Sequence, residues 1–487
     1  MSDSDNAHDS PSQDIKSKWI WSDYLVVTGL ALMTVYALLQ LLLFKYGRDQ
    51  GIYSLVAKAM VEGGSPYRDA WDFKPPGIYF VYALAHVLFG SHYYGIRLIE
   101  VVGLVAAIPC FVLIGRRYFG DSRVGIFGAA LAILIESQLE FWHTSQPESF
   151  GGILTIFALA ICTQQSLSCE KWRPRQWSLV AASGALIGAA CLMKPHLIAA
   201  LPVFSLAVSY RSSLPGKNVV RWLRPIAAMS VGLLVPMILC WAWFANKGTL
   251  GDLRETLFVF APGYASTTFI WNYFHDFFYS ALEDLVAMYS ASILLGTLAL
   301  LALPPAHHRE REGAVVLTGV IVIHLAGIAI QSKFFPYHYG ATLPLMALLA
   351  AVGINKLWLR ARAFDVWGAA VFLAVMAVVV TCRSATRDLA DSYWNRSERR
   401  TRAWLSGDGA RQEVEDRALY SAADVNYGEN LDISRWTTQH VAPSESVFLW
   451  GFEPFVYEEA NRKSASRVIY NVPQRAAWEQ EQARSML

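Results

Sequence analysis

The chain has 487 residues, of which 54% are hydrophobic and only 16% are charged, and its net charge is +2. A soluble protein of this size carries about 25% charged residues. Here the apolar residues form blocks near 20 long, the length that spans a bilayer. Composition therefore excludes a soluble enzyme and predicts a polytopic membrane protein. Because Lys and Arg are spread along the chain and form no patch, we expect no nucleic-acid partner.

The N-terminal residues 1–20 are rich in Ser, Asp and Asn, which predicts a disordered tail. They lack the basic-then-apolar pattern of a cleaved signal peptide, so the first apolar run is expected to stay as an anchor. Six cysteines lie in or beside apolar runs without metal-ligand spacing, and we expect them to be free and buried. They are Cys110, Cys162, Cys169, Cys191, Cys240 and Cys382.

The apolar blocks predict an all-α polytopic membrane domain over residues 21–382. We expect about 11 membrane spans: roughly 24–44, 95–114, 123–136, 149–167, 178–193, 196–210, 225–245, 277–303, 314–330, 337–355 and 365–382. Alternate short loops are rich in Arg and Lys, and by the positive-inside rule they are cytoplasmic, together with the N-terminus. The first outer loop, 45–94, and the C-terminal residues 383–487 then lie on the opposite, extracytoplasmic side.

Two helices are expected inside the first outer loop. Residues 50–62 show helical spacing of apolar side chains and end at Gly63-Gly64, while residues 77–89 are apolar but too short to span. Both are predicted to lie along the bilayer interface. In the charged C-terminal region we expect strands at 447–450 and 467–470 around a helix at 454–462. That pattern predicts a small extracytoplasmic α/β module.

Two carboxylates stand out on the outer side. Asp49 precedes an interfacial helix, where it would serve as an N-cap or as a general base held at the water boundary. Glu148 begins a span and has the same two interpretations: an N-cap, or a second carboxylate facing Asp49 that orients a hydroxyl or holds a divalent cation. Spacing alone leaves both pairs of alternatives open, and the cofactor prediction is either none or a divalent cation.

Several cationic side chains fall on the same outer side. Lys74 stands before Pro75-Pro76, and is either a lysine anchored at the interface or a cation held rigidly for a phosphate, with Arg68 nearby. Ionisable residues where spans meet are candidates for function, although anchoring in the aromatic belt would also explain them. These residues are Lys194, His196, Lys333 and His338. Together with Lys74 they would make a cradle for a lipid phosphate.

Several motifs in this chain resemble those of the GT-C superfamily of membrane glycosyltransferases, and most closely its bacterial protein mannosyltransferase/ArnT-like group. They are D-Q-G-I-Y (49–53), G-G-S-P-Y-R-D (63–69), W-D-F-K-P-P-G (71–77), Q-P-E (146–148), K-P (194–195), K-F-F-P-Y-H-Y (333–339) and W-G-F-E-P-F-V-Y (450–457). The resemblance covers the whole chain and is strongest over residues 48–80. Many relatives have Asp-Glu where Gln50 follows Asp49 here.

The resemblance implies a polyprenyl-phosphate-linked sugar donor used on the outer face of a bacterial inner membrane. Asp49 would act on the acceptor hydroxyl, Lys74 would contact the donor phosphate, and Tyr53 falls in the substrate-binding motif. The acceptor is an envelope glycan, lipid or protein that the sequence does not specify, and the protein would also contact membrane lipids. The alternative is a secondary transporter or lipid flippase, which would likewise be polytopic. No inverted repeat is evident in favour of it.

Overall fold

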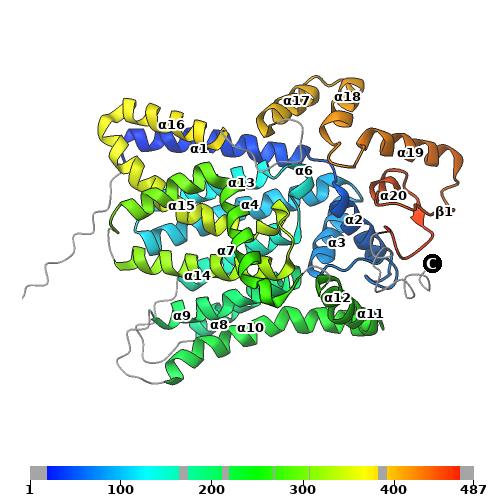
Figure 1. The fold of residues 1–487 in the computed structure, drawn as a ribbon, viewed down its shortest axis with the longest axis horizontal. Coiled ribbons are helices and arrows are strands. Elements are labelled where there is room, and N and C mark those ends of the chain that lie inside the picture. The colour runs from blue at the N-terminus through cyan, green and yellow to red at the C-terminus, as the bar shows by residue number, and fades with distance from the viewer. Residues whose placement is uncertain are drawn as a thin grey trace, which may run out of the picture.

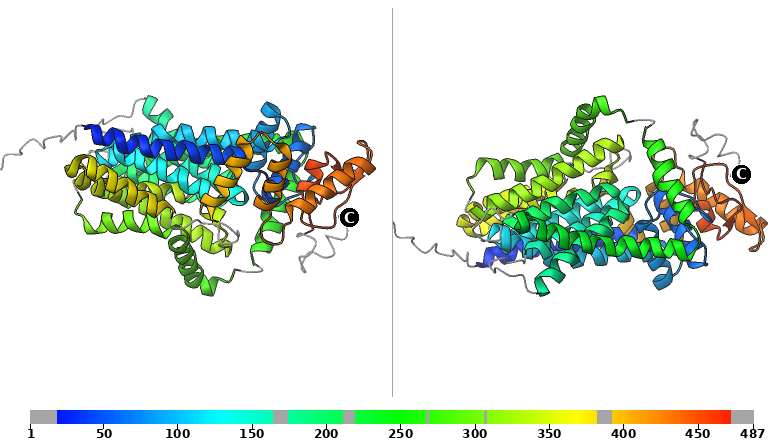
Figure 2. Two further views of the ribbon diagram at one scale, coloured as in Figure 1. Left: turned by 90° about the horizontal axis from the view of Figure 1, so that it is seen from above. Right: turned by 90° about the horizontal axis from the view of Figure 1, so that it is seen from below.

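The computed structural model describes residues 19–163, 174–210, 219–266, 269–305, 308–381 and 392–471. The predicted N-terminal tail up to residue 18 lies outside the described residues, as does the predicted domain boundary at 382–383. Long helices run side by side through most of the molecule, and the shorter elements gather at one end (Figures 1 and 2). Of the six cysteines, the four within the described residues form no disulfide bond with one another, and all but the partly buried Cys110 are buried: Cys110, Cys162, Cys191 and Cys240.

Each of the predicted spans coincides with a helix of the bundle. These helices are α1 (Trp21–Leu43), α4 (Tyr93–Phe119), α5 (Ser122–Gln138), α7 (Pro147–Thr163), α8 (Pro174–Met193), α9 (Ala200–Tyr210), α10 (Val219–Asn246), α13 (Phe274–Ala302), α14 (His308–Gln331), α15 (Leu343–Ala361) and α16 (Asp365–Thr381). By length and composition, six described stretches are apolar enough to cross a membrane, or seven with the bent pair in α13. The expected count of about 11 spans therefore stays a prediction.

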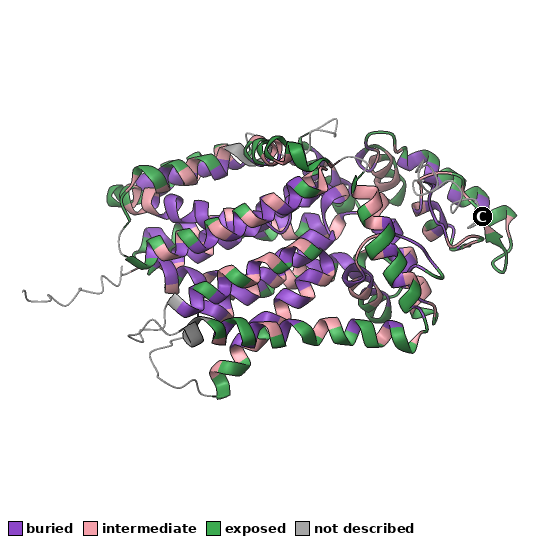
Figure 3. Ribbon diagram, turned by 60° about the horizontal axis from the view of Figure 1, so that its bottom comes forward, coloured by how far each residue is buried: buried purple, intermediate pink, exposed green. Residues whose placement is uncertain are grey.

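Small residues let the bundle helices approach closely. A side chain at Gly232 of α10 would overlap the backbone of Ala181 in α8, and one at Gly184 would overlap Met229. Such contacts between small residues are the usual means of packing helices in lipid, where helix association has no hydrophobic driving force. Figure 3 shows buried residues between the helices and exposed residues on their outward faces. Large apolar side chains such as Leu239 and Trp241 are among the exposed ones, as lipid-facing surfaces require.

A buried ionic network links the helices at the end of the bundle where α1 begins. Asp23 Oδ1 accepts hydrogen bonds from Arg123 of α5 and from the indole of Trp358 in α15, both at 2.7 Å. Arg362, in the turn η5 (Arg362–Phe364), lies 3.4 Å from the other oxygen of Asp23. These residues belong to helix ends and short loops that the positive-inside rule assigned to the cytoplasmic side of the membrane. In the structure they lie close together.

The opposite end carries the first loop and the C-terminal region (Figure 1). It includes α2 (Arg48–Val61), α3 (Gly77–Phe89), α6 (Glu140–His143), η1 (Pro195–Ala199), α11 (Leu250–Glu255), η2 (Thr256–Phe260), α12 (Ala261–Ser266), η3 (Trp271–Tyr273) and η4 (Pro336–Tyr339). The C-terminal elements are α17 (Tyr393–Leu405), α18 (Gly409–Leu419), α19 (Tyr427–His440), β1 (Ser446–Val447), α20 (Phe455–Glu459) and β2 (Lys463–Ser464).

The expected α/β module is mostly helical. Its only sheet among the described residues pairs β1 with β2 in parallel, two residues each. The strand predicted at 467–470 does not join that sheet, because Val468 instead forms a parallel bridge with Trp71 of the first loop. The module is anchored on the bundle through Arg400, which donates to Glu140 at 2.8 Å and to Gln40 at 2.9 Å.

The two helices of the first loop form where predicted, but only α3 presents an apolar face outward. Its Val87 and Leu88 are exposed, as an interfacial helix requires. By contrast, α2 is largely buried, and its Gly51 lies against Pro454 at the start of α20. The prediction that α2 lies along the interface was wrong because the C-terminal region covers it. The helix stops where expected, with Gly63 at φ +99°, a left-handed conformation that favours glycine.

Candidate functional site

Asp49 lies in the first turn of α2 but does not cap it. The N-cap is Gly47, so the N-cap interpretation of Asp49 was wrong, although its charge still favours the positive end of the helix. The side chain is partly buried, and within the described residues no hydrogen bond or ion pair engages its carboxylate. A carboxylate with spare acceptor capacity at a helix start is well placed to take a proton.

Gln50 fixes the start of α2, and this explains why an amide stands there. Its Nε2 lies 3.1 Å from the Phe141 carbonyl and 2.6 Å from the Thr144 carbonyl, while its Oε1 accepts from the Gly47 amide at 3.1 Å. A glutamate could not donate to those carbonyls. Gln50 therefore stands where many relatives have a second carboxylate. Its hydrogen bonds fix the first turn of α2, which carries Asp49.

Lys74 faces the site from the turn before α3. Pro75 and Pro76 follow it, and Pro76 caps α3 with φ −71°, so the backbone at the lysine is fixed. Its ammonium lies 5.4 Å from the centroid of the Tyr337 ring. Burial acts to lower the pKa of Lys74, but Tyr337 together with the nearby carboxylates raises it overall. Lys74 is therefore a permanent cation. The carboxylates are those of Asp49, Glu148 and Asp72.

Glu148 is paired with a lysine rather than capping a helix. It is fully buried in the first turn of α7, and its Oε1 lies 2.8 Å from Lys194 Nζ. Lys194 also donates to Gln331 at 3.2 Å. Burial lowers the pKa of Lys194, and Glu148 opposes that shift. The N-cap interpretation of Glu148 was therefore wrong, and its charge is already balanced by Lys194.

The segment after α14 contributes Lys333, Tyr337 and His338. Lys333 is half-buried, with Nζ 3.4 Å from the centroid of the Tyr264 ring of α12. Burial, reinforced by Lys74 and Lys194, lowers the pKa of Lys333 to about 8. The same causes lower the pKa of His338 well below its usual value, and its Nδ1 is hydrogen-bonded to the Lys333 carbonyl. His338 is therefore a neutral imidazole, not one of the cations that we expected.

Three predicted residues lie at the edge of this cluster or behind it. Arg68 pairs with Asp69 at 3.0 Å on the exposed side of the loop, and none of its contacts among the described residues reaches the cluster. Tyr53 is buried behind Asp49 and donates to Gln146 at 3.0 Å. The ring of His196 packs against that of His324 inside the bundle, with centroids 6.1 Å apart.

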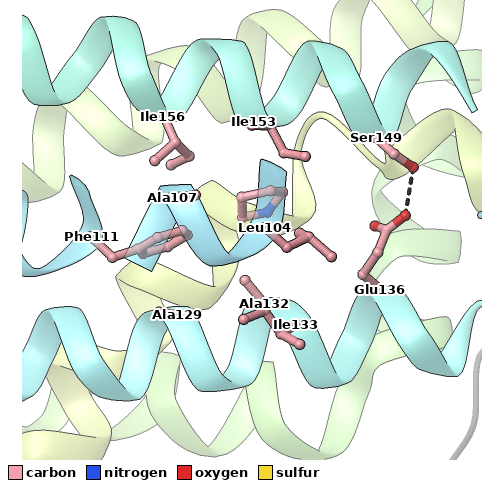
Figure 4. Close-up of a pocket in the computed structure, with 11 residues that line it drawn as sticks. Leu104, Ala107, Phe111, Ala129, Ala132, Ile133, Glu136, Ser149, Ile153 and Ile156 are labelled. Carbon is pink, nitrogen blue, oxygen red and sulfur yellow. Dashed lines mark hydrogen bonds between the residues drawn. The ribbon is translucent and has the colours of Figure 1, made fainter. Parts of the chain in front are cut away.

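A separate apolar cavity lies inside the bundle, between α4, α5, α7 and α15. Its only polar lining is Glu136 with Ser149, whose hydroxyl donates to Glu136 at 2.5 Å (Figure 4). Ser149 follows Glu148 in α7, so the cavity lies next to the ionic cluster but does not include it. Its side chains offer no cation for a phosphate. The candidate site is therefore the ionic cluster, which comprises Asp49, Asp72, Lys74, Glu148, Lys194, Lys333, Tyr337 and His338.

The described residues hold no group of three or more His, Cys, Asp or Glu side chains placed to bind a metal ion. The carboxylates of the cluster do not make such a site, because Lys194 neutralises Glu148 and Tyr79 and Tyr470 donate to Asp72. Asp49 is the carboxylate of the cluster left without such a partner among the described residues, and a divalent cation at the site stays a prediction.

Comparison with known proteins finds similarity over part of the chain. Residues 73–244 match the family described as dolichyl-phosphate-mannose-protein mannosyltransferase. The undecaprenyl phosphate-α-4-amino-4-deoxy-L-arabinose arabinosyl transferase of Pseudomonas paraeruginosa is 26% identical over 203 residues. That match spans 40% of this chain and 35% of the relative, about a third of its length.

Solved structures show the same fold over nearly the whole chain. ArnT from Cupriavidus metallidurans bound to undecaprenyl phosphate has a TM-score of 0.57 at 15% identity, covering 91% of this chain and 86% of that one. The apo form of that ArnT gives 0.55 at 15% identity, covering 91% and 85%. This chain is thus a multi-pass membrane protein with the fold of these ArnT structures. Over part of its length it is also similar to the matched mannosyltransferase family and to the arabinosyl transferase, in agreement with the resemblance of its motifs.

Proposed function

We propose that this protein is a glycosyltransferase that moves a sugar from a polyprenyl-phosphate donor to a hydroxyl of an envelope acceptor. The observation that carries the proposal is the cluster itself, in which Asp49 lies within electrostatic reach of Lys74 and Lys194, with Lys333 beside both lysines. A general base beside several cations is what such a transfer requires. The ArnT crystal structure with undecaprenyl phosphate and the matched mannosyltransferase family support the same class of donor.

The two carboxylates have different roles in this proposal. Asp49 takes the proton of the acceptor hydroxyl, because no partner among the described residues engages its carboxylate. The acceptor oxygen then attacks the anomeric carbon, and the bond between that carbon and the phosphate oxygen breaks with inversion of configuration. Glu148 keeps Lys194 charged and in place instead of acting as a second base. The transfer occurs on the outer face of the bacterial inner membrane, with the N-terminus in the cytoplasm.

The leaving lipid phosphate gains negative charge as the bond breaks. Lys74 meets that charge as a permanent cation, and Lys333 adds to it when protonated. Buried cations already in position stabilise a developing anion far more than solvent does, because they need no reorganisation. Tyr337 borders the same space, and its hydroxyl can donate a hydrogen bond instead of supplying charge. Neutral His338 uses its Nδ1–H on the Lys333 carbonyl and helps to hold that segment in place.

The test is transfer of labelled sugar from polyprenyl-phosphate donors to a membrane extract by the purified protein in lipid vesicles. Asp49→Asn should lower kcat by about 10²- to 10⁴-fold, the usual effect of losing a general base. Lys74→Ala should raise the donor KM by about 10- to 100-fold, because it removes a charged partner of the phosphate. The control is Lys463→Ala, which changes an exposed lysine paired with Glu62 at 2.7 Å and should leave transfer unchanged.

Each outcome decides a part of the proposal. Unchanged transfer by Asp49→Asn would assign the base to another residue, with Glu148 the next to test. Transfer that is abolished by a chelator and restored by a divalent cation would contradict the metal-free mechanism. No transfer from any donor, together with lipid flipping or solute uptake by the vesicles, would refute the proposal in favour of a transporter.

A further inference from the structure

The turn that carries Lys74 is held by three tyrosine hydroxyls. Tyr67 donates to the Lys74 carbonyl at 2.8 Å. The Tyr79 hydroxyl lies 2.8 Å from Asp72 Oδ2 and 3.2 Å from the same carbonyl. Tyr470 donates to Asp72 Oδ1 at 2.7 Å. Two of these tyrosines belong to the first loop and to α3, whereas the third comes from the C-terminal region.

Tyr470 reaches the turn because its segment pairs with the first loop. The Trp71 amide donates to the Arg467 carbonyl at 2.7 Å, and Trp71 and Val468 form a parallel bridge. The ring of Tyr470 stacks on that of Phe452, with centroids 5.1 Å apart. Val468 and Tyr470 are each only 2% exposed, so this contact is a packed interface. The segment therefore forms part of the wall behind Asp72.

Asp72 depends on these donors because it is buried. Burial raises the pKa of the Asp72 carboxyl, while Lys74 and the hydroxyls of Tyr470 and Tyr79 oppose that shift. A buried carboxylate stays ionised only where donors and a counter-charge replace the water it has lost. Without the Tyr470 hydroxyl, Oδ1 of this buried carboxylate, two residues before Lys74, would lose its side-chain donor.

We propose that Tyr470 is a positioning residue for the donor phosphate: its hydroxyl holds the Asp72 carboxylate, and Asp72 holds Lys74 where the phosphate binds. This inference rests on the proposed function. It makes the C-terminal segment a part of the donor site, although that segment lies about 400 residues away in sequence. Tyr470 itself does not touch the reacting atoms.

The experiment compares Tyr470→Phe with the wild-type protein in vesicles. The phenylalanine keeps the ring stacked on Phe452 and removes only the hydroxyl. We expect the donor KM and the dissociation constant for polyprenyl phosphate to rise by about tenfold, the effect of losing a hydrogen bond to a charged group. The acceptor KM should stay the same, whereas kcat at saturating donor should fall as well, because a displaced Lys74 stabilises the leaving phosphate less. The control is Tyr427→Phe, a buried tyrosine of the same region that makes a ring contact with Phe455.

Testing the same substitution in an Asp72→Asn protein separates a positioning role of Tyr470 from an effect on protein stability. In Asp72→Asn, the added Tyr470→Phe change should have little further effect on phosphate binding, because the two residues act through one hydrogen bond. Equal effects in both backgrounds, or a Tyr470→Phe variant that behaves like Tyr427→Phe, would overturn the inference. If the wild type binds polyprenyl phosphate but transfers no sugar, the proposed function fails, and the binding data still decide the role of Tyr470. A wild type that binds no polyprenyl phosphate refutes both.

Discussion

Lys333 is the residue of the site whose charge changes near neutral pH. Because burial and the neighbouring Lys74 and Lys194 lower its pKa to about 8, its ammonium is charged below that pH and neutral above it. The kcat/KM for the donor reports ionisations of the free enzyme, so it should fall as the pH rises through about 8. The ring of Tyr264 and neutral His338 also face this lysine, and neither changes charge in that range.

The variant Lys333→Arg tests this assignment. A guanidinium stays protonated to above about pH 12, so the alkaline fall in kcat/KM should move to higher pH while activity at pH 7 is retained. Measuring the pH profile of both proteins with one donor is sufficient. An alkaline limb at the same pH in both would show that another group causes it.

The pair of Glu148 and Lys194 gives a second prediction at the scale of single residues. Glu148→Gln leaves a buried ammonium without its counter-charge, which should cost about 3–5 kcal/mol of stability. Lys194→Met in the same protein should restore most of that loss, as thermal unfolding in detergent would measure. If Glu148 only balances Lys194, the double variant should lose much less kcat than Asp49→Asn does, because the base is still present. A fall in kcat as large as that of Asp49→Asn would instead make Glu148 a base.

The sequence predicted most of the residues of the cluster but not their charge states. Lys74, Glu148, Lys194 and Lys333 could be found because polar residues between apolar spans are conspicuous. That His338 is neutral could not be inferred, because its pKa depends on burial and on lysines far away in sequence. Asp72 stood within the recognised motif without a role, since nothing local shows that two tyrosine hydroxyls satisfy it.

At the scale of elements, the packing of α3 on α8 sets the distance between Lys74, which precedes α3, and Lys194, which follows α8. A Cβ at Gly77 would lie 2.6 Å from the Leu192 carbonyl oxygen and 3.0 Å from the Met193 amide. Gly77, which ends the motif W-D-F-K-P-P-G, is therefore required because the backbones of α3 and α8 approach closely there, next to Lys74 and Lys194. Because both neighbours are backbone atoms, a larger residue must move the helix itself.

Gly77→Ala should therefore weaken transfer without abolishing the fold. We expect a loss of about 1–3 kcal/mol of stability from overpacking, and a donor KM raised by about tenfold or more as Lys74 moves away from Lys194. Gly251→Ala is the matched control, because a Cβ there meets nothing within 4 Å. Wild-type kinetics in Gly77→Ala would show that the approach of α3 to α8 does not set the geometry of the site.

The elements that sequence analysis predicted well are those with a local signal. Apolar blocks mark the bundle helices, and Gly63 with the prolines marks the ends of α2 and α3. The pairing of Trp71 with Val468 has no such signal, because it joins single residues about 400 positions apart. The burial of α2 was missed for the same reason: Pro454, which covers Gly51, belongs to a region that sequence analysis treated as a separate module.

At the scale of the whole molecule, polar residues divide between the two ends of the bundle. One end has the network of Asp23 with Arg123 and Trp358, in which each charge is matched and the contacts are structural. At the other end, the ammonium groups of Lys74 and Lys333 form no salt bridge among the described residues and lie near the rings of Tyr337 and Tyr264, and the C-terminal region covers this end (Figure 1). Cations without a paired carboxylate at one end of a membrane bundle favour an anionic ligand arriving from that side.

This division predicts the orientation in the membrane. In a variant with all six cysteines replaced, Ser444→Cys in the C-terminal region should react with a membrane-impermeant maleimide in intact spheroplasts. Ala363→Cys, exposed in the turn between α15 and α16, should react only after permeabilisation. The basic residues around that turn, Arg360 and Arg362, place it in the cytoplasm by the positive-inside rule. The reverse labelling pattern would put Asp49 and Lys74 on the cytoplasmic side, and a transfer on the outer face would then be excluded.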